Sequence, residues 1–255
     1  MLAAHELTFS AGSTRILDGV SLRAPAGKVT VLIGPNGAGK STALKCLTGE
    51  LHPQQGGVTL ADRPLTSIPA SELALRRAVL PQASALSFPF TVGEVVALGL
   101  RAGQHPPEQE HIARAALERV GMSRHANRLY QTLSGGEQQR VHLARVLTQV
   151  WEPVSENGPR YLFLDEPTSS LDIRHQIEVL EIAAAYAREG GGVVIVLHDL
   201  ELAASYADHL VVMESGRVVA EGDNPEEIID PNLLQSVYGL NATMIAKRWP
   251  SMAWA

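Results

Sequence analysis

The chain has 255 residues, a net charge of −6 and one cysteine, and this length suits one large domain or two small ones. No apolar run reaches the length of a membrane span, no secretory signal opens the chain, and a single cysteine excludes an internal disulfide. The acidic balance, without a long Lys/Arg run, disfavours a dedicated nucleic-acid binder. We therefore expect a soluble cytoplasmic chain that does not bind nucleic acid.

The first eighty residues predict a strand-rich segment around one buried strand. Weak apolar alternation over residues 1–28 predicts short antiparallel strands. The β-branched run Val29–Ile33 predicts a buried parallel strand flanked by them. The segments that follow predict a helix at 43–47, a strand at 58–60, a short helix at 71–77 and a strand at 78–80.

A glycine-rich segment joins the strand Val29–Ile33 to the helix after it. It fits the phosphate-binding P-loop pattern G-x-x-x-x-G-K-[ST], and its residues are Gly34, Pro35, Asn36, Gly37, Ala38, Gly39, Lys40, Ser41 and Thr42. Its glycines let backbone N–H groups approach phosphate oxygens, and the helix N-terminus attracts negative charge. We expect Lys40 to reach the β- and γ-phosphates of a nucleoside triphosphate and Ser41 to ligate Mg²⁺. A glycine turn without a nucleotide role is the alternative, which the complete pattern disfavours.

The pattern changes to helical between residues 83 and 150. Thr91 with Glu94 three residues later predicts a capped helix over 91–100, and the spacing over 108–120 predicts another after the interruption by Pro106 and Pro107. We therefore predict one domain over residues 1–255, with an α/β core from 1–82 and 151–255 and an inserted helical subdomain at 83–150.

A second motif lies at the end of this helical block. Residues 133–140 read Leu-Ser-Gly-Gly-Glu-Gln-Gln-Arg, a Ser/Gly turn that runs into a helix whose N-terminus can face a phosphate. Ser134 and Glu137 can also form a capping box. Capping and anion binding use the same helix end, so both roles can hold together.

Parallel-strand signals return after a loop predicted at 151–160. They predict strands at 161–164 and 192–197 with a helix at 173–189 between them, a hairpin at 211–219 and a helix at 225–238. The first of these strands ends in Asp165 and Glu166, at the sheet edge where α/β proteins bind ligands. Beside a P-loop, Asp165 suits holding hydrated Mg²⁺ and Glu166 suits orienting or deprotonating the attacking water; an N-cap pair is the plainer alternative.

These three motifs, in this order, resemble the nucleotide-binding subunit of ATP-binding cassette (ABC) transporters over nearly the whole chain. The motif at 133–140 is specific to that family among P-loop ATPases. The resemblance implies an α/β P-loop NTPase core with an N-terminal antiparallel β-subdomain and an inserted α-helical subdomain. It also implies that the chain binds ATP and Mg²⁺ and hydrolyses ATP to drive transport.

The resemblance assigns roles to further residues. Gln82 matches the glutamine that contacts Mg²⁺ and the attacking water, and His198 matches the histidine that contacts the γ-phosphate. Asp172 matches the aspartate that crosses the dimer interface. The other eight histidines are scattered without ligand-like pairing, so we expect them to be solvated or to cap helices. The chain departs from the family where an aromatic residue usually stacks on adenine, because Ala11 stands there and Phe9 lies two residues earlier.

The family's mechanism implies a head-to-tail homodimer that closes on two ATP molecules. Each P-loop would face the partner copy's Ser134, Gly135, Gly136 and Glu137. The permease would be a separate polypeptide with a periplasmic substrate-binding protein behind it, and this chain would sit on the cytoplasmic face of the bacterial inner membrane. Residues 83–100 would form the groove for the permease.

Weaker features resemble the ATPase subunit of haem importers, within the group that imports iron siderophores and cobalamin. They are the residues 87–92, the extended loop 151–160 and the residues 237–240. Importers of ferric siderophores or cobalamin stay open as an alternative. So does a soluble ABC ATPase of iron–sulfur cluster assembly, which has similar length and the same nucleotide motifs.

Overall fold

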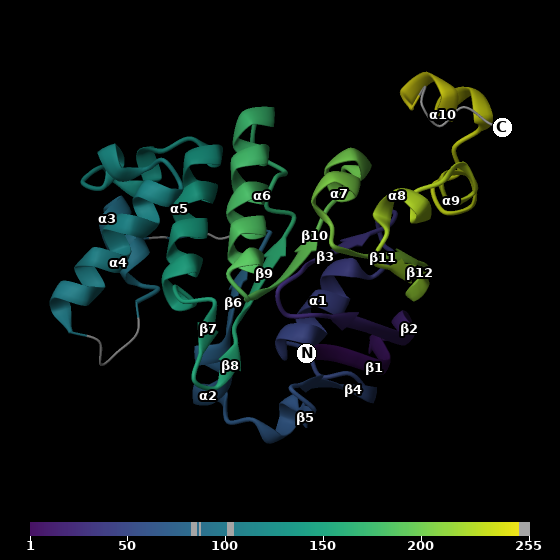
Figure 1. The fold of residues 1–255 in the computed structure, drawn as a ribbon, viewed down its shortest axis with the longest axis horizontal. Coiled ribbons are helices and arrows are strands. Elements are labelled where there is room, and N and C mark those ends of the chain that lie inside the picture. The colour runs from purple at the N-terminus through teal and green to yellow at the C-terminus, as the bar shows by residue number, and fades with distance from the viewer. Residues whose placement is uncertain (83–85, 87, 101–104, 250–255) are drawn as a thin grey trace. The chain divides into compact units, whose positions relative to one another are not determined.

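The computed structural model describes residues 1–82, 86, 88–100 and 105–249. The chain forms two compact units, whose elements are labelled in Figure 1. Unit 1 comprises Met1–Pro25, Val29–Ser67 and Val196–Ala255, and unit 2 comprises Ala26–Lys28 and Ile68–Ile195. The predicted subdomains, with 83–150 inserted between 1–82 and 151–255, stay a prediction.

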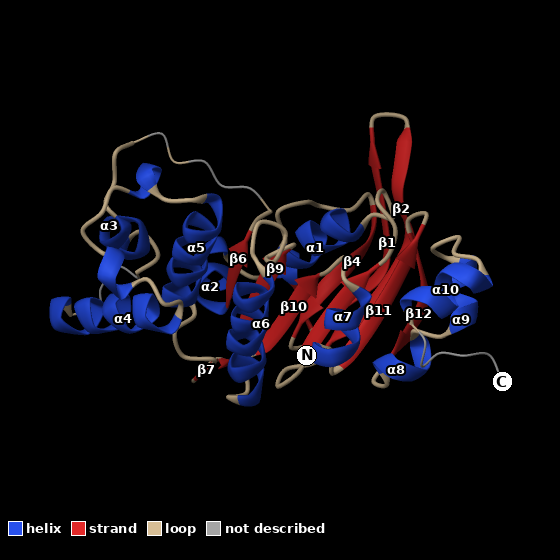
Figure 2. Cartoon of the chain, turned by 90° about the horizontal axis from the view of Figure 1, so that it is seen from above, coloured by secondary structure: helices blue, strands red, loops and turns tan. Residues whose placement is uncertain are grey.

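Unit 1 contains a four-stranded antiparallel sheet in the order β2-β1-β4-β5. Its strands are β1 (Leu2–Ala11), β2 (Thr14–Ala24), β4 (Gln55–Leu60) and β5 (Arg63–Pro64), and a short 3₁₀ helix, η1 (Leu65–Ser67), follows. β1 pairs with β2 and β4, so that Leu2 lies opposite both Ala24 and Leu60, and all three are buried. Figure 2 shows β1 and β2 running side by side. The antiparallel strands predicted for residues 1–28 are confirmed.

Three further strands of unit 1 lie in the order β12-β11-β3. β3 (Val29–Ile33) is buried along its whole length and runs parallel to β11 (His209–Glu214), as its β-branched sequence predicted. β12 (Arg217–Gly222) pairs with β11 in the opposite direction. Ser215 and Gly216, with φ of 48° and 80°, make the tight turn between them, and positive φ at both positions matches the twist of a hairpin. The predicted hairpin is confirmed.

Helix α1 (Lys40–Thr48) follows the P-loop and ends at Gly49, whose φ of 75° gives the left-handed C-cap that glycine favours. Cys46 is buried on this helix, and burial raises the pKa of its thiol to about 11. A thiol with so high a pKa is not ionised at neutral pH, so Cys46 acts as a small apolar side chain.

The C-terminal part of unit 1 is helical, but in shorter pieces than predicted. It contains α7 (Leu200–Tyr206), α8 (Pro225–Ile228), α9 (Pro231–Ser236) and α10 (Ala242–Arg248). The single helix predicted at 225–238 is wrong, because Asp230 precedes a proline and adopts an extended conformation. The Asp230 carboxylate instead accepts a hydrogen bond from the Leu233 N–H at 2.7 Å and starts α9 as its N-cap.

Unit 2 holds strands in the order β10-β9-β6, which are β10 (Gly192–Val196, whose last residue belongs to unit 1), β9 (Tyr161–Asp165) and β6 (Arg77–Leu80). β6 and β9 are parallel, with Arg77 opposite Tyr161 and Leu80 opposite Leu164. All residues of β9 and β10 are buried, as their apolar runs predicted. α2 (Ala70–Arg76) precedes β6, and α6 (Ile173–Arg188) follows β9.

The part of unit 2 between residues 83 and 150 that the structure describes is helical. It contains α3 (Val92–Ala97), α4 (Pro106–Arg119) and α5 (Gly135–Gln149), with the short 3₁₀ helices η2 (Ser123–His125) and η3 (Tyr130–Thr132). Thr91 and Glu94 form both hydrogen bonds of a capping box at the start of α3, as predicted. Two predictions include residues outside the described part of the chain. They are the permease groove, which includes residues 83–85 and 87, and the haem-importer resemblance, which includes residue 87.

Two local predictions in unit 2 are wrong. Pro106 and Pro107 do not interrupt a helix but begin α4. The N–H groups of the first helical turn have no partner within the helix, so proline, which lacks an N–H, is tolerated there. The loop predicted at 151–160 contains a small antiparallel pair, β7 (Val154–Ser155) and β8 (Gly158–Pro159). Its turn depends on the φ of 99° at Gly158, which the alternation of apolar residues does not reveal.

Candidate nucleotide-binding site

The P-loop lies in unit 1, between the end of β3 and the start of α1. Gly34 has φ of 147°, and a Cβ built on it would lie 2.0 Å from the carbonyl oxygen of Met213 at the end of β11. Gly37 and Gly39 also adopt positive φ, of 80° and 97°. The loop therefore follows a path that requires glycine, and its first residue packs directly on a neighbouring strand.

The first turn of α1 and the Lys40 side chain line the inside of this loop. Gly39 is the N-cap residue, and glycine has no side chain with which to cap the first amides of the helix. Lys40 is only 5% exposed, and its Nζ donates to the carbonyl oxygens of Gly34 at 2.8 Å and Pro35 at 2.9 Å. A buried ammonium beside an uncapped helix N-terminus is an arrangement that attracts phosphate. The loop thus fits a nucleotide polyphosphate.

The two predicted carboxylates follow one another at the end of β9 in unit 2. Asp165 is 4% exposed. Glu166 has φ of 50°, a conformation that costs a non-glycine residue about 1–2 kcal/mol and that is found preferentially at functional sites. The Gln82 amide donates from Nε2 to Oε2 of Glu166 at 2.7 Å. The structure therefore brings together the glutamine and the glutamate that the sequence assigned to hydrolysis.

The predicted metal ligands have the right chemistry for Mg²⁺. This ion takes oxygen ligands, keeps several waters and binds one or two protein carboxylates together with substrate phosphates. Asp165 offers a buried carboxylate, Gln82 an amide oxygen and Ser41 a hydroxyl in the first turn of α1. Among the described residues no group of three His, Cys, Asp or Glu could hold a metal ion.

The motif at 133–140 forms the start of α5. Ser134 is the N-cap, its N–H and hydroxyl donate to Oε2 of Glu137 at 2.8 Å each, and its Oγ accepts from the Glu137 N–H at 3.4 Å. The backbone hydrogen bond from Ser134 is the main reason that the Glu137 pKa is lowered. A Cβ on Gly135 would meet open space, whereas one on Gly136 would lie 3.2 Å from Leu171. The predicted capping box is confirmed, and one glycine leaves the helix end uncovered.

Asp172 and His198 each lie at a helix start. Asp172 is the N-cap of α6, where it accepts from the His175 N–H at 2.9 Å, and this bond is the main cause of its lowered pKa. His198 is exposed between β10 and α7 in unit 1. Asp199, next in sequence, caps α7 by accepting from the N–H groups of Glu201 and Leu202. Local capping therefore fixes the backbone beside both predicted residues.

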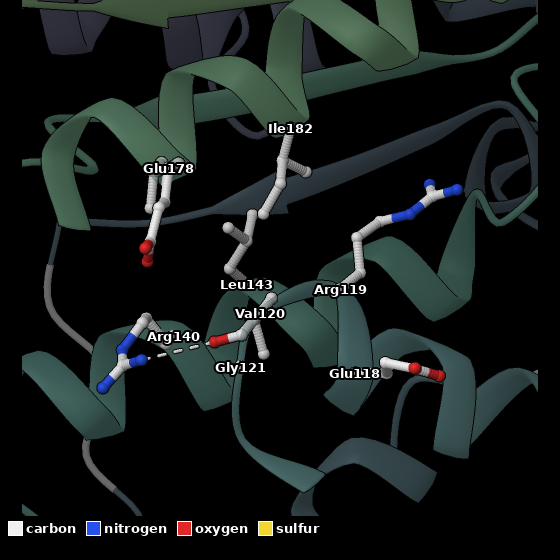
Figure 3. Close-up of a pocket in the computed structure, with 9 residues that line it drawn as sticks. Glu118, Arg119, Val120, Gly121, Arg140, Leu143, Glu178 and Ile182 are labelled. Atoms are coloured by element: carbon white, nitrogen blue, oxygen red, sulfur yellow. Dashed lines mark hydrogen bonds between the residues drawn. The ribbon is translucent and has the colours of Figure 1, made fainter. Parts of the chain in front are cut away.

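A separate cavity of about 230 Å³ lies in unit 2 between the C-terminal end of α4 and helices α5 and α6 (Figure 3). Figure 3 shows Arg140 donating to the carbonyl oxygen of Val120, at 3.4 Å, at one side of it. Its described lining residues are Glu118, Arg119, Val120, Gly121, Arg140, Leu143, Glu178, Val179 and Ile182. Arg140 is the last residue of the motif at 133–140, but none of the lining residues is among those predicted to bind ATP or Mg²⁺.

A model of the ABC transporter family matches residues 17–169, which cover the P-loop, the motif at 133–140 and the two carboxylates. The chain belongs to the ABC transporter family. The Hemin import ATP-binding protein HmuV of Mesorhizobium japonicum is 49% identical to it over 241 residues, 93% of this chain and 91% of that protein. The protein of the same name from Jannaschia sp. is 51% identical, over 94% of this chain and 87% of its own.

Solved structures of the ABC family share the whole fold. An ATP-binding subunit of an ABC transporter is 25% identical with a TM-score of 0.77, and each chain covers 100% of the other. A dimeric ATP-binding cassette in a post-hydrolysis state, bound to ADP and Pi, is 26% identical with a TM-score of 0.74, over 88% of this chain and 98% of that one. The predicted P-loop NTPase fold and the ATPase activity of an ABC transporter subunit are confirmed. None of the described helices is long and apolar enough to cross a membrane.

The sequence of this ABC subunit left two buried histidines unrecognised. His142, expected to be solvated or to cap a helix, is 4% exposed inside α5, and its Nε2 lies 2.7 Å from the Tyr130 hydroxyl. His209, on β11, is also buried, with its ring nitrogens 2.7 Å from Asp223 and 2.8 Å from Glu221. Apolar neighbours on both sides of His142, Val141 and Leu143, were the available sign of burial.

Proposed function

We propose that this chain is the ATP-hydrolysing subunit of a bacterial importer of haem (hemin). The observation that carries the proposal is the similarity, at about half of all positions and over nearly the whole chain, to proteins named as hemin import ATP-binding proteins. The geometry of the P-loop and the contact between Gln82 and Glu166 are what such a subunit requires.

The P-loop binds the phosphates of ATP. Backbone N–H groups of Gly34–Thr42 and the N-terminus of α1 surround the polyphosphate, and Lys40 exchanges its two carbonyl partners for the β- and γ-phosphate oxygens. The Lys40 ammonium is already buried in the loop, so no further positive charge has to be buried there when ATP binds. Ala11 leaves the usual adenine-stacking position without an aromatic ring, so the phosphates supply most of the binding.

Glu166 orients and deprotonates the attacking water. Gln82 donates to Glu166 through its amide nitrogen, so its carbonyl oxygen is the atom suited to the cation. Ser41, Gln82 and Asp165 would hold Mg²⁺, which would neutralise charge on the transferred phosphate. His198 contacts the γ-phosphate from the start of α7.

Two copies act together. The uncovered end of α5, with Ser134, Gly135, Gly136 and Glu137, binds the ATP held by the partner copy's P-loop, and Asp172 contacts the partner across the interface. The dimeric cassette among the solved relatives supports this arrangement. Closure of the homodimer on ATP drives a separate permease that receives haem from a periplasmic binding protein. The subunit then sits on the cytoplasmic face of the inner membrane.

Reconstitution with a permease that co-purifies with this chain tests the proposal. ATP hydrolysis is measured in vesicles with the periplasmic binding protein loaded in turn with haem, a ferric siderophore or cobalamin. Stimulation by haem alone is the expected result. Stimulation by another ligand would support the proposed mechanism but would show that the importer transports that ligand instead of haem. If no permease associates with the chain, an ATPase of iron–sulfur cluster assembly becomes the favoured function.

A further inference from the structure

The tight turn between β11 and β12 lies directly against the P-loop, within unit 1. The Gly216 N–H of this turn donates to the carbonyl oxygen of Ala38 at 3.1 Å. Met213, near the end of β11, lies beside two further residues of the loop. A Cβ on Gly34 would lie 2.0 Å from the Met213 carbonyl oxygen, and one on Gly39 would lie 3.7 Å from its Cε atom. The segment from Met213 to Gly216 therefore packs on the loop at several points.

The bond from Gly216 determines the direction of an N–H group in the loop. The carbonyl oxygen of Ala38 and the N–H of Gly39 belong to one planar trans peptide unit, in which the two groups point in opposite directions. Fixing the oxygen toward Gly216 therefore directs the Gly39 N–H away from the turn. Backbone N–H groups of this loop are the groups proposed to bind phosphate, so the turn influences how the loop presents them.

Strand β2 fixes the same turn. The carbonyl oxygen of Gly216 accepts from the Asp18 N–H at 2.8 Å. Gly216 has φ of 80°, and a Cβ on it would lie 2.5 Å from the carbonyl oxygen of Ile16. Gly216 thus bridges Asp18 and Ala38 through its two backbone polar groups, in a space that leaves no room for a side chain.

The Asp18 side chain binds the next residue of the hairpin. Its Oδ2 accepts from Nε of Arg217 at 2.9 Å and from Nη2 of the same guanidinium, and its Oδ1 accepts from Nη1 of Arg15 at 2.9 Å. The Arg217 and Arg15 side chains are 69% and 63% exposed, so these ion pairs contribute little to the stability of the fold. Their effect is local, because Asp18 binds two consecutive residues, Gly216 through its N–H and Arg217 through its carboxylate.

A second group of ion pairs joins β2 and the β12 segment away from the turn. Nε of Arg23, near the end of β2, lies 3.9 Å from Oε1 of Glu221, and its Nη2 lies 3.6 Å from Oδ2 of Asp223. The Arg23 side chain is also largely exposed. This group therefore resembles the one at Asp18 in exposure and in the strands that it connects, but it lies at the opposite end of β12.

We propose that Asp18 is a positioning residue for ATP binding, which holds Gly216 and Arg217 so that the β11–β12 turn keeps Ala38 in place. This inference rests on the proposed role of the P-loop. Phosphate binding requires backbone N–H groups at defined positions, and a loop that is ordered before the ligand arrives loses less conformational freedom on binding. Loss of the Asp18 carboxylate would release Arg217 and leave only the backbone bond between Asp18 and Gly216.

The test compares Asp18→Ala with Arg23→Ala and with the wild-type protein. Each variant removes exposed ion pairs between β2 and the β12 segment, but only Asp18→Ala removes them beside the turn that contacts the P-loop. We expect Asp18→Ala to weaken binding of a non-hydrolysable ATP analogue by about 2- to 5-fold, the size of one exposed ion pair. Hydrogen exchange at the Gly216 amide, which bonds to Ala38, should accelerate more than exchange at the β11 amides, which report global unfolding. Arg23→Ala should keep wild-type affinity and exchange.

Two further variants change the same contacts in other ways. Arg217→Ala removes the partner of Asp18, so it should reproduce the loss of affinity, and the double variant should lose no more than Asp18→Ala alone. Gly216→Ala places a Cβ against the Ile16 carbonyl and should weaken binding more strongly, by about 10-fold or more.

Wild-type affinity in Asp18→Ala would overturn the proposal, including the case in which this variant unfolds more easily, because the contacts would then be structural only. An equal loss of affinity in Arg23→Ala would overturn it as well. A wild-type protein that fails to bind the analogue would refute the proposed function of the P-loop, whatever the variants do. The two failures are therefore distinguishable.

Discussion

At the scale of single residues, the P-loop glycines differ in how much space the fold leaves for a side chain. The sequence motif identifies all three glycines at once, but it gives no reason to rank them. The ranking depends on Met213, which lies far along the chain and reaches Gly34 only after β11 has paired with β3. In the same way, the sequence places Glu166 at a strand end, but its positive φ and its contact with Gln82 appear only in the folded chain.

Alanine substitutions at Gly34 and Gly37 should therefore have unequal effects. The Gly37 Cβ would meet nothing within 4 Å, so only its positive φ matters and Gly37→Ala should cost about 1–2 kcal/mol. Gly34→Ala adds a collision with the Met213 carbonyl and should cost more, by about another 1–3 kcal/mol. Urea unfolding of the two variants measures the difference. Equal losses would show that the packing of Gly34 on β11 is not a constraint.

At the scale of elements, the sequence predicted the capping boxes, but it did not predict every helix start or the short β7–β8 pair. Both capping boxes follow from two residues three positions apart, so Thr91 with Glu94 and Ser134 with Glu137 could be predicted from sequence alone. The starts of α4 and α9 differ from the prediction, because Pro106 and Pro231 each occupy the first position of a helix, and neither position begins a predicted helix. The β7–β8 pair depends on a single left-handed glycine.

The two capping boxes allow a matched test of the motif at 133–140. Thr91→Ala and Ser134→Ala each remove an N-cap hydroxyl and should each lower the free energy of unfolding by about 1 kcal/mol. When each is combined with Glu166→Gln, which keeps ATP unhydrolysed, only Ser134→Ala should also abolish ATP-dependent dimerisation of the isolated subunit, because only this helix end is proposed to meet the partner's ATP. Light scattering with ATP measures the second effect. Loss of dimerisation in both variants, or in neither, would show that Ser134 acts only as a helix N-cap.

The buried His142 on α5 makes the stability of the folded chain depend on pH. Burial, together with the positive charge of Arg145, lowers the His142 pKa from 6.5 to about 4. Between these values the unfolded chain binds a proton that the folded chain does not, so stability falls as the pH falls from 6.5 to 4, by on the order of 2–3 kcal/mol. Urea unfolding at pH 7 and pH 4.5 should show a smaller pH effect in His142→Gln than in wild type. His52→Gln, at an exposed position, should keep the wild-type pH effect; an unchanged effect in both variants would contradict the assignment.

At the scale of the whole molecule, ordered motifs were more informative than composition. The buried runs predicted the strands β3, β9 and β10, because parallel strands covered on both faces need continuous apolar sequence. The order of three motifs identified the ABC family, and the family model agrees.

The central claim is that ATP closes two copies of this chain and that Glu166 ends the closed state by hydrolysis. Glu166→Gln keeps the shape of the side chain but removes its basicity, so hydrolysis should fall by about 100-fold or more while ATP binding remains. The decisive measurement is the mass of this variant with ATP and Mg²⁺ by light scattering, beside Glu189→Gln at the far end of α6 as the charge-matched control. We predict a doubling of the mass for Glu166→Gln only. A Glu166→Gln variant that binds ATP and stays monomeric would contradict the account.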